Sequence, residues 1–567
     1  MPSTSKPCHN CRRRRLRCDR SWPTCHKCAV SGQECLGYGK VFVWTTQAID
    51  SHGNLKPTQS SRHATDPHVS AASSTATSPI MMSSSDMTLP PSNPHQGHAQ
   101  PLMPTNESMC PAVSPEPGTA SAMVLTDPVF QDLDRPSRSY LAYFADRVCQ
   151  DLVGRDSPGS NPFRELLPMT RKHPLLLQIL IATSAIHWSN IIRPITDIST
   201  GLTDPGGYLA SLRSRDLVSR QALIDALTAK QKAMVHMREV LDTLDPAGSE
   251  VALAAMHFFI KFDLIDVEKK DPSSWKAHLE GAASIMALLT PDNMRSSSSR
   301  TLRDCVIADC FIYHIFGSTL SSGGLAARIA KYAFDLLPVM KRVEVTSSLS
   351  CPPEILQIIL MASQLSYDTP CTDTYVNNTH YLTLSAHYSN FICSWSLPPT
   401  KEALSLIDQA LTFDIPAWAE QLRQIPHITD VESRVHVASA HRSAACLYIL
   451  QALPLVRSLR PVDTDLLVKD ILEHVAALGH DDPYFKASSW PTFIAGAETC
   501  DAEKRTWTLK RLLDMWETCR WGYIFTAIEM LKATWQLQDA AAKAGNMDSR
   551  AHWLQDLKGL GFEHLIV

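Results

Sequence analysis

The chain has 567 residues, of which 44% are hydrophobic and 19% charged, and its formal net charge is −4. This length is too great for one ordinary domain, and the composition is that of a soluble globular protein. The longest apolar stretch runs from Pro174 to Ile192 and is interrupted by polar side chains. We therefore expect a buried helix there and exclude a membrane span, and the polar N-terminus excludes a secretory signal peptide.

The positive charge is concentrated at the N-terminus. Residues 1–40 carry nine lysines and arginines against two acidic residues, which leaves 44 basic and 55 acidic residues in the rest of the chain. The small net charge says nothing about nucleic acid, but a basic end on an acidic body does. It predicts that only the N-terminal part of the chain meets a polyanion.

Six cysteines lie within the first 35 residues in the pattern C-x2-C-x6-C-x6-C-x2-C-x6-C, which is one unit used twice. They are Cys8, Cys11, Cys18, Cys25, Cys28 and Cys35. Without an export signal, these residues predict metal binding before disulfides. Zinc favours four tetrahedral thiolate ligands, so six sulfurs serve two zinc ions only if two of them bridge both metals. The repeat favours an equivalent bridging pair, one from each half, but spacing alone does not identify it.

A run of arginines, from Arg12 to Arg17, separates the second and third cysteines. No proline or glycine interrupts it, so we expect a short helix whose exposed face is nearly all guanidinium. Arginine pairs bidentately with guanine in the major groove and also with phosphate. The run therefore predicts double-stranded DNA as a partner. It also fits a nuclear localisation signal, and the two uses do not exclude each other.

The chain divides into a cluster domain at 1–44, a linker at 45–127 and a helical domain at 128–567. Residues 45–125 contain eleven prolines and no aromatic residue, which predicts a disordered, Ser/Pro-rich linker. No heptad pattern follows the cysteines, so a coiled coil is not indicated and a homodimer is left open.

Helical periodicity runs through the third zone of the chain, the helical domain at 128–567. Residues 220–245 carry one apolar stripe, residues 251–266 are apolar nearly all round, and residues 503–540 repeat apolar positions at steps of three and four. The stripe positions are Leu223, Leu227, Met234, Met237, Leu241 and Leu244, and then Leu509, Leu512, Trp516, Cys519, Tyr523, Ala527, Met530 and Trp535. Alternating strand patterns are nearly absent. We expect one large all-α regulatory domain of a dozen or more helices.

The cluster domain at 1–44, called the head below, resembles the fungal six-cysteine binuclear zinc cluster transcription factors. The resemblance rests on all six cysteine positions, on the basic run after the second cysteine and on Pro23 before the fourth. In that family the first and fourth cysteines bridge the metals, which implies this role for Cys8 and Cys25. The cofactor implied is zinc, two ions per chain.

The same resemblance assigns roles to the arginines. The family's base-reading pair falls on Arg14 and Arg15, and Arg12 and Arg17 would then contact phosphate. Recognition of CGG-type half-sites follows as an expectation. Three stretches of the third zone are similar to the branch that includes the acriflavine-sensitivity regulators: SYLAYFADRV from Ser139, HPLLLQILIATSAIHW from His173 and SSWKAHLEGAASIM from Ser273.

The sequence therefore predicts a nuclear, DNA-binding regulator of RNA polymerase II genes, for a metabolic or secondary-metabolite gene set. Its partners would be DNA and the transcription machinery or co-regulators, with no membrane. Two alternatives are a zinc-stabilised protein-interaction scaffold and an enzyme in residues 128–567. That zone contains no G-x-S-x-G, H-E-x-x-H, Walker A or G-x-G-x-x-G motif, which disfavours an enzyme.

Overall fold

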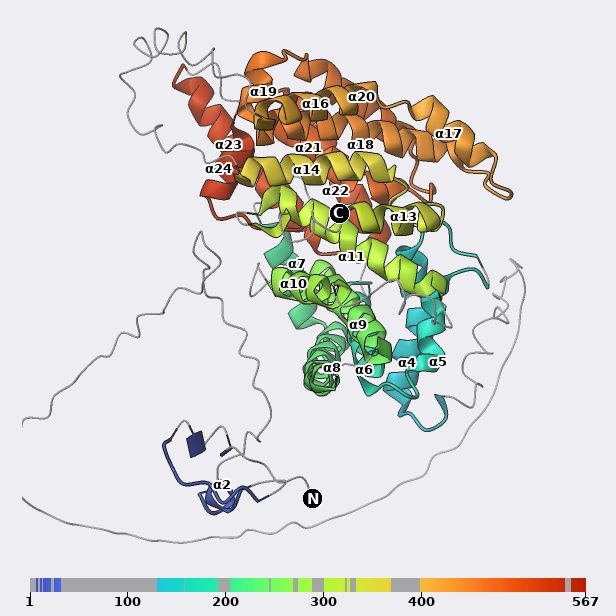
Figure 1. Ribbon diagram of the computed structural model, residues 1–567, viewed down its shortest axis with the longest axis vertical. Coiled ribbons are helices and arrows are strands. Elements are labelled where there is room, and N and C mark those ends of the chain that lie inside the picture. Colours follow the sequence, from blue (N-terminus) through green and yellow to red (C-terminus); the bar gives the residue numbers. More distant parts are fainter. Residues whose placement is uncertain are drawn as a thin grey trace, which may run out of the picture. The chain divides into compact units, whose positions relative to one another are not determined.

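The computed structural model describes two parts of the chain, the N-terminal head and the helical body (Figure 1). The described residues are 7–8, 11–12, 14–21, 25–31, 130–157, 159–191, 204–243, 246–268, 274–287, 300–321, 324–326, 333–368, 398–545 and 552–567. The expected disordered linker at 45–127 lies outside them, and so does Cys35.

The described body is helical, as expected for an all-α domain (Figure 1). Its α-helices are α4 (Arg135–Tyr143), α5 (Leu166–Met169), α6 (Pro174–Ile191), α7 (Pro205–Arg215), α8 (Leu217–Asp242), α9 (Pro246–Ile265), α10 (Ser274–Met286), α11 (Arg300–Leu320), α13 (Ala333–Val343), α14 (Pro353–Asp368), α16 (Pro398–Thr412), α17 (Ile415–Arg423), α18 (Val431–Ala452), α19 (Pro454–Leu459), α20 (Thr464–Ala477), α21 (Ser489–Glu498), α22 (Ala502–Cys519), α23 (Tyr523–Lys543) and α24 (Trp553–Gly559). Short π and 3-10 turns are η2 (Phe144–Val148), η3 (Cys149–Leu152), η4 (Pro162–Glu165) and η7 (Phe485–Ser488). Within the described ranges, the strand-like pairing is one isolated bridge between Val153 and Ser347.

Many helix starts in the body coincide with aspartate caps. The Asp216 carboxylate accepts two N–H groups of the first turn of α8 at 3.1 and 2.9 Å, and Asp501 does the same for α22 at 2.8 and 3.1 Å. Helices α4, α7 and α17 add a proline in the first turn, where its missing N–H costs nothing. These side chains satisfy donors that a helix start leaves without intrahelical partners.

Helices α6 and α9 form the most apolar part of the core. By length and composition α6 could span a membrane, but 72% of it is buried within the body, as expected from the sequence. Helix α9 is buried nearly all round, which confirms the prediction for 251–266. Both helices can be apolar nearly all round because neighbouring helices cover most of their surface, although Trp188 of α6 is 39% exposed.

Helix α8 confirms the helix predicted at 220–245, but its buried face matches the expected stripe only in part. Met237 is buried and Leu241 packs partly buried against the core, whereas Leu244 lies outside the described residues. The side chains that face the core are Ala222, Ala226, Ala229, Ala233 and Met237. Leu227 is 44% exposed, and Leu223 and Met234 are only partly buried. Because α8 packs closely along α6, alanines fit the contact and the larger leucines are displaced toward its edges.

The predicted stripe at 503–540 is divided between two helices, α22 and α23, although all of its positions are buried. The helix is interrupted between Cys519 and Tyr523. Arg520 there has a φ of +56°, and the Gly522 N–H donates to the Ile265 carbonyl at the end of α9 at 3.1 Å. A Cβ on Gly522 would lie 2.3 Å from the Asp266 carbonyl oxygen. This close backbone approach requires glycine and fixes the corner between α22 and α23 beside α9.

Candidate metal centre and DNA-binding surface

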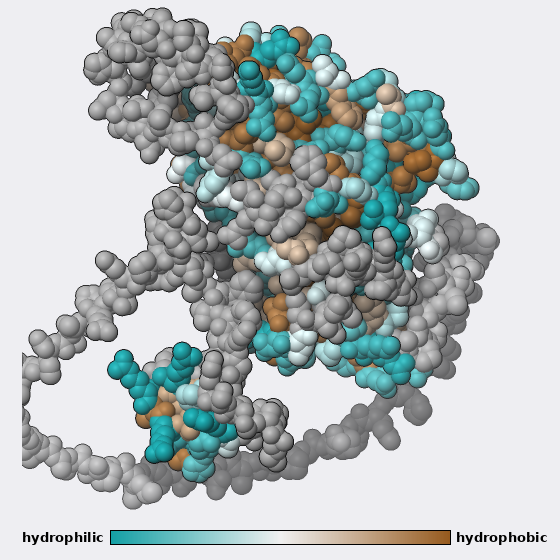
Figure 2. Space-filling model, in the orientation of Figure 1, coloured by the Kyte–Doolittle hydropathy of each residue, from teal (hydrophilic) through white to brown (hydrophobic). Residues whose placement is uncertain are grey.

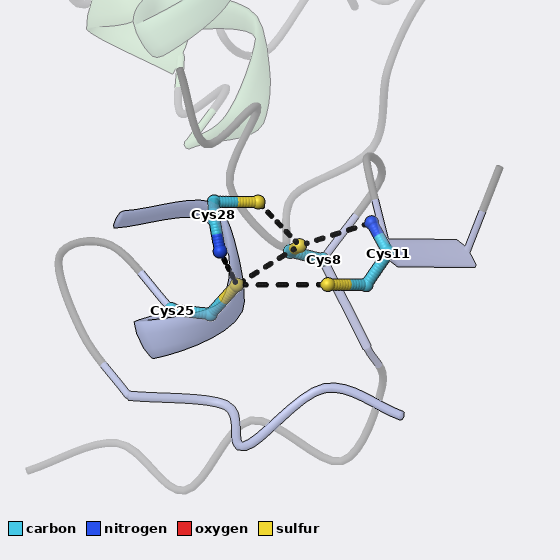
Figure 3. Close-up of side chains that lie close together, drawn as sticks. All are labelled: Cys8, Cys11, Cys25 and Cys28. Atoms are coloured by element: carbon cyan, nitrogen blue, oxygen red, sulfur yellow. Dashed lines mark hydrogen bonds between the residues drawn. The ribbon is translucent and has the colours of Figure 1, made fainter. Parts of the chain in front are cut away.

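Four of the six predicted zinc ligands gather in one buried group (Figure 3). The Sγ–Sγ distances are 3.5 Å from Cys8 to Cys25, 3.8 Å from Cys8 to Cys28 and 3.7 Å from Cys11 to Cys25. Tetrahedral zinc with bonds of about 2.3 Å separates its sulfur ligands by about 3.8 Å. The four sulfurs therefore already lie at the spacing that a shared zinc centre requires.

The two halves of the head have the same local backbone. Cys8 Sγ accepts the Cys11 N–H at 3.4 Å, and Cys25 Sγ accepts the Cys28 N–H at 3.4 Å. In each half, the carbonyl of the first cysteine also accepts the N–H four residues later, at 2.9 and 3.0 Å. In the second half this turn begins helix α2 (His26–Val30), with Cys25 as its N-cap. The repeat in the sequence is thus a repeat in the structure.

Cys18 is the fifth of the predicted zinc ligands that the structure describes. Its Sγ accepts the Cys8 N–H at 3.4 Å, and its sulfur and that of Cys25 lie within 4.8 Å of each other. Desolvation raises the pKa of the Cys18 thiol, but N–H donors from Cys8 and Arg20 outweigh it and lower that pKa to about 7. Desolvation raises the pKa of Cys11 and of Cys25. A bound zinc ion would reverse this effect, because coordination deprotonates a thiol outright.

Asp19 is a structural residue that the sequence analysis missed. Its Oδ2 accepts the His26 N–H at 3.1 Å and also the Ser21 hydroxyl, and these hydrogen bonds lower the pKa of the carboxyl. Asp19 follows the third cysteine, whereas His26 is the first residue of α2, so the contact ties the two halves together. The bonded groups are seven residues apart, and a cap at this separation has no sequence signature.

The helix expected between Cys11 and Cys18 is shorter than the arginine run: Cys11 and Arg12 are helical, and Arg14 and Arg15 are not. The turn that the Cys8 carbonyl closes with the Arg12 N–H leads into this helix, and Arg15 adopts the left-handed conformation with φ +54°. The Leu16 N–H donates to the Cys11 carbonyl at 2.8 Å and the Arg15 N–H to the Arg12 carbonyl at 3.2 Å. This bond pair is the Schellman stop signal, so the helix ends before Arg15. The prediction of a short helix therefore holds for the start of the run and not for its end.

The predicted DNA-contacting side chains lie on the surface of the head. Arg12, Arg14, Arg15 and Arg17 are all exposed, and none of them forms an ion pair with a described residue. Figure 2 shows hydrophilic residues over most of the described head, with few hydrophobic ones. Cations at the end of a helical turn also face the negative end of its dipole, which favours them there.

In comparisons with known proteins, two family models match two separate parts of the chain. The family model of the fungal Zn(2)-Cys(6) binuclear cluster domain matches residues 6–41, and that of the fungal specific transcription factor domain matches residues 139–561. The chain is 32% identical, over an alignment of 626 residues, to the acriflavine sensitivity control protein acr-2 of Neurospora crassa, which covers 100% of this chain and 97% of that protein. No solved structure matches the chain.

Proposed function

Because the chain belongs to the fungal transcription factors that carry a Zn(2)-Cys(6) binuclear cluster, we propose that its head holds two zinc ions and binds CGG-type half-sites in DNA. Membership makes the chain a zinc-binding and DNA-binding transcription regulator that acts with the transcription machinery, and not an enzyme. The family also implies a nuclear location. The metal count, the base-reading residues and the arrangement of copies on DNA are our proposal.

We assign the bridging role to the sulfurs of Cys8 and Cys25. Cys8 Sγ lies within 3.8 Å of the sulfurs of both Cys25 and Cys28, and Cys25 Sγ lies within 3.7 Å of those of both Cys8 and Cys11. This pair is therefore at the centre of the sulfur group, where both metals can reach it. The remaining ligands divide between the metals as Cys11 with Cys18 and Cys28 with Cys35. Each zinc then has four sulfurs.

The exposed arginines on a metal-anchored turn are the observation that supports DNA recognition. We assign Arg14 and Arg15 to guanine bases, and Arg12 and Arg17 to phosphates. A bidentate arginine–guanine pair discriminates against a wrong base by about 1–3 kcal/mol, whereas phosphate contacts add affinity without sequence preference. Because this turn includes the predicted zinc ligands Cys8 and Cys11, metal binding would fix the turn and the direction of the arginines that it carries.

The test compares the full-length protein on a CGG-containing duplex with the same duplex carrying CAG, by fluorescence anisotropy. We expect at least about a tenfold preference for CGG, in line with one or two bidentate contacts, and its loss when a chelator removes zinc. Equal affinity for the two duplexes would contradict CGG recognition. Failure to bind any member of a random duplex library would favour the scaffold alternative.

A platform of this size contacts only a few base pairs, so we propose that two copies bind paired half-sites. Sedimentation of the full-length protein on a two-site duplex should then give a complex with two chains, and one chain at saturation would contradict the pairing. Mapping of bound sites across the genome, together with transcript changes on deletion, would return the motif, the spacing and the target genes. It would also decide whether those genes form a metabolic or secondary-metabolite set.

A further inference from the structure

A cavity of about 60 Å³ lies in the helical body, where α9, α11 and the corner between α22 and α23 meet. Its charged and polar lining includes Asp151, Lys261, Asp309, Tyr313, Lys486 and Trp521. One water occupies about 10–15 Å³ of such a volume, so the cavity has room for about four to six waters or a ligand of similar size. Four of the lining residues are ionisable, two lysines and two aspartates.

Lys261 is the most unusual of these residues. Its side chain extends from α9, the residue is only 3% exposed, and burial lowers the pKa of its ammonium group. Nζ lies 4.8 Å from the ring centroid of Trp521 and 5.2 Å from that of Tyr313. Its one ion-pair partner in the described part of the chain is Asp309, whose Oδ2 is 3.8 Å away. That distance is too long for a hydrogen bond.

Asp309 does not neutralise Lys261 fully, because it has a closer partner. The same Oδ2 lies 2.9 Å from His257 Nε2, and the imidazole is completely buried. A buried ammonium needs hydrogen-bond acceptors at short distance to offset its desolvation. The aromatic rings of Tyr313 and Trp521 attract the cation, but they supply no such acceptor.

Two further donors line the cavity without an acceptor among the described residues. They are the Tyr313 hydroxyl and the Trp521 indole N–H, on residues that are 3% and 6% exposed. Asp151 contributes a carboxylate whose Oδ1 lies 3.2 Å from Lys486 Nζ and whose Oδ2 lies 3.6 Å from His187 Nε2. Three donor groups of the lining, on Lys261, Tyr313 and Trp521, thus have no hydrogen-bonded acceptor among the described residues, and buried polar groups of this kind are normally satisfied by water or a ligand.

We propose that this cavity binds a small monocarboxylate of about four to six non-hydrogen atoms, the size that the volume allows. Its carboxylate accepts hydrogen bonds from Lys261 Nζ, Tyr313 Oη and Trp521 Nε1. Its short aliphatic part packs against the apolar lining of Ile312 and Leu349. A dianion is disfavoured, because Asp151 and Asp309 already bring two negative charges to the same cavity.

Binding at this place would connect helices that are distant in the sequence. Lys261 belongs to α9, Tyr313 to α11, and Trp521 to the corner that Gly522 holds against the end of α9. A carboxylate that joins all three stabilises the folded body by mass action, in proportion to its occupancy. The role of this cavity as an effector site rests on the proposed function of the chain as a transcription regulator. Binding of the carboxylate itself does not depend on zinc or on DNA recognition.

The experiment measures binding of propionate to the full-length protein by isothermal titration calorimetry, with propionamide as an uncharged ligand of the same shape. We expect saturable binding of one propionate per chain and at least tenfold weaker binding of propionamide. Lys261→Met should weaken propionate binding at least tenfold, and Lys469→Met, at an exposed lysine on α20, should leave it unchanged.

A second variant guards against loss of folding in Lys261→Met. Tyr313→Phe keeps the aromatic ring and removes only the hydroxyl donor, so it should weaken propionate binding several-fold with an unchanged far-UV circular dichroism spectrum. No saturable binding of propionate would mean that the cavity holds only water, which overturns the proposal. Equal binding of propionamide, or equal binding by Lys261→Met that is folded, would overturn it as well. Normal CGG binding alongside any of these results would leave the proposed function intact.

Discussion

The arginines of the head have the same charge but different backbone positions, and this difference sets their expected roles. Arg12 lies within the helical turn, Arg15 is the left-handed residue that ends it, and Arg17 lies beyond it, outside any helix or turn. A side chain on the final turn of a metal-anchored helix has a fixed direction, which suits base contacts. Phosphate contacts need no such fixed direction, so a residue beyond the turn suits them.

Replacement of Arg15 by alanine should separate these roles. Alanine is no more strained than arginine at φ +54°, so the fold of the head is expected to stay the same. Affinity for a CGG duplex should fall by about 1–3 kcal/mol, with little change for random DNA at the same salt concentration. Arg17→Ala is the matched variant and should weaken both complexes alike, with a salt dependence reduced by about one phosphate contact. Equal losses on both duplexes for Arg15→Ala would make Arg15 a phosphate contact.

At the scale of secondary structure, periodicity predicted the existence and type of the body helices well. It succeeded at α6 and α9, which are apolar nearly all round, because no choice of buried face is needed there. It succeeded only in part at α8, where most of the fully buried side chains are alanines and the leucines lie toward the edge of the contact. Side-chain size at a close helix contact depends on the partner helix, which a single sequence does not reveal.

At the metal centre too, features set by the local sequence were predictable and features set by distant contacts were not. Cysteine spacing predicted ligands whose sulfurs gather in the structure, because metal coordination requires little beyond residue type and separation. The turn that ends at Arg15 and the Asp19 bridge to α2 were not predictable, since both depend on how the two halves meet. The polar cavity was also missed, because its lining comes from segments that lie hundreds of residues apart.

The corner between α22 and α23 provides a test of close packing. Gly522→Ala places a Cβ 2.3 Å from a backbone oxygen, so the backbone must shift, and we expect a loss of about 1–3 kcal/mol in the stability of the body. Gly479→Ala is a suitable control, because nothing lies within 4 Å of its added Cβ, and its effect should stay within about 0.5 kcal/mol. Urea denaturation of the full-length protein measures both. Equal midpoints for the two variants would contradict the steric argument.

Helix α18 carries a buried histidine that should make the body sensitive to acid. His441 is fully buried, its Nδ1 lies 2.9 Å from the Val437 carbonyl, and burial lowers its pKa to about 4. In the unfolded chain a histidine has a pKa of about 6.5. Between these values the unfolded chain binds the proton first, so stability falls as the pH drops from 6.5 to 4, by roughly 3 kcal/mol for this residue.

Substitution of His441 by glutamine removes this proton uptake and should flatten the decline of the urea midpoint over that pH range. The exposed His552 is the control position, and His552→Gln should leave the pH dependence of the midpoint as it is in the original protein. A decline of the same steepness in all three proteins would show that His441 does not contribute to acid sensitivity.

The whole molecule separates its chemistry between two parts that differ in charge and in the source of their stability. The head is basic, and its buried hydrophobic cluster consists of cysteines, so its folding free energy must come largely from metal binding. The body is acidic overall and has an extensive apolar core that needs no metal. Removal of zinc should therefore unfold the head and leave the helical body folded.

Zinc content of the full-length protein tests this division and the bridged arrangement together. Among the described residues, every sulfur group with metal-ligand spacing lies in the head, and the described cysteines of the body are buried apart from Cys500. We therefore expect two zinc ions per chain by elemental analysis, and loss of DNA binding without loss of the body's far-UV signal after chelation. Cys35→Ser should lower the count below two, whereas Cys500→Ser should leave it at two. One zinc per chain in the original protein would mean four ligands around a single metal, and the shared roles of Cys8 and Cys25 would then be wrong.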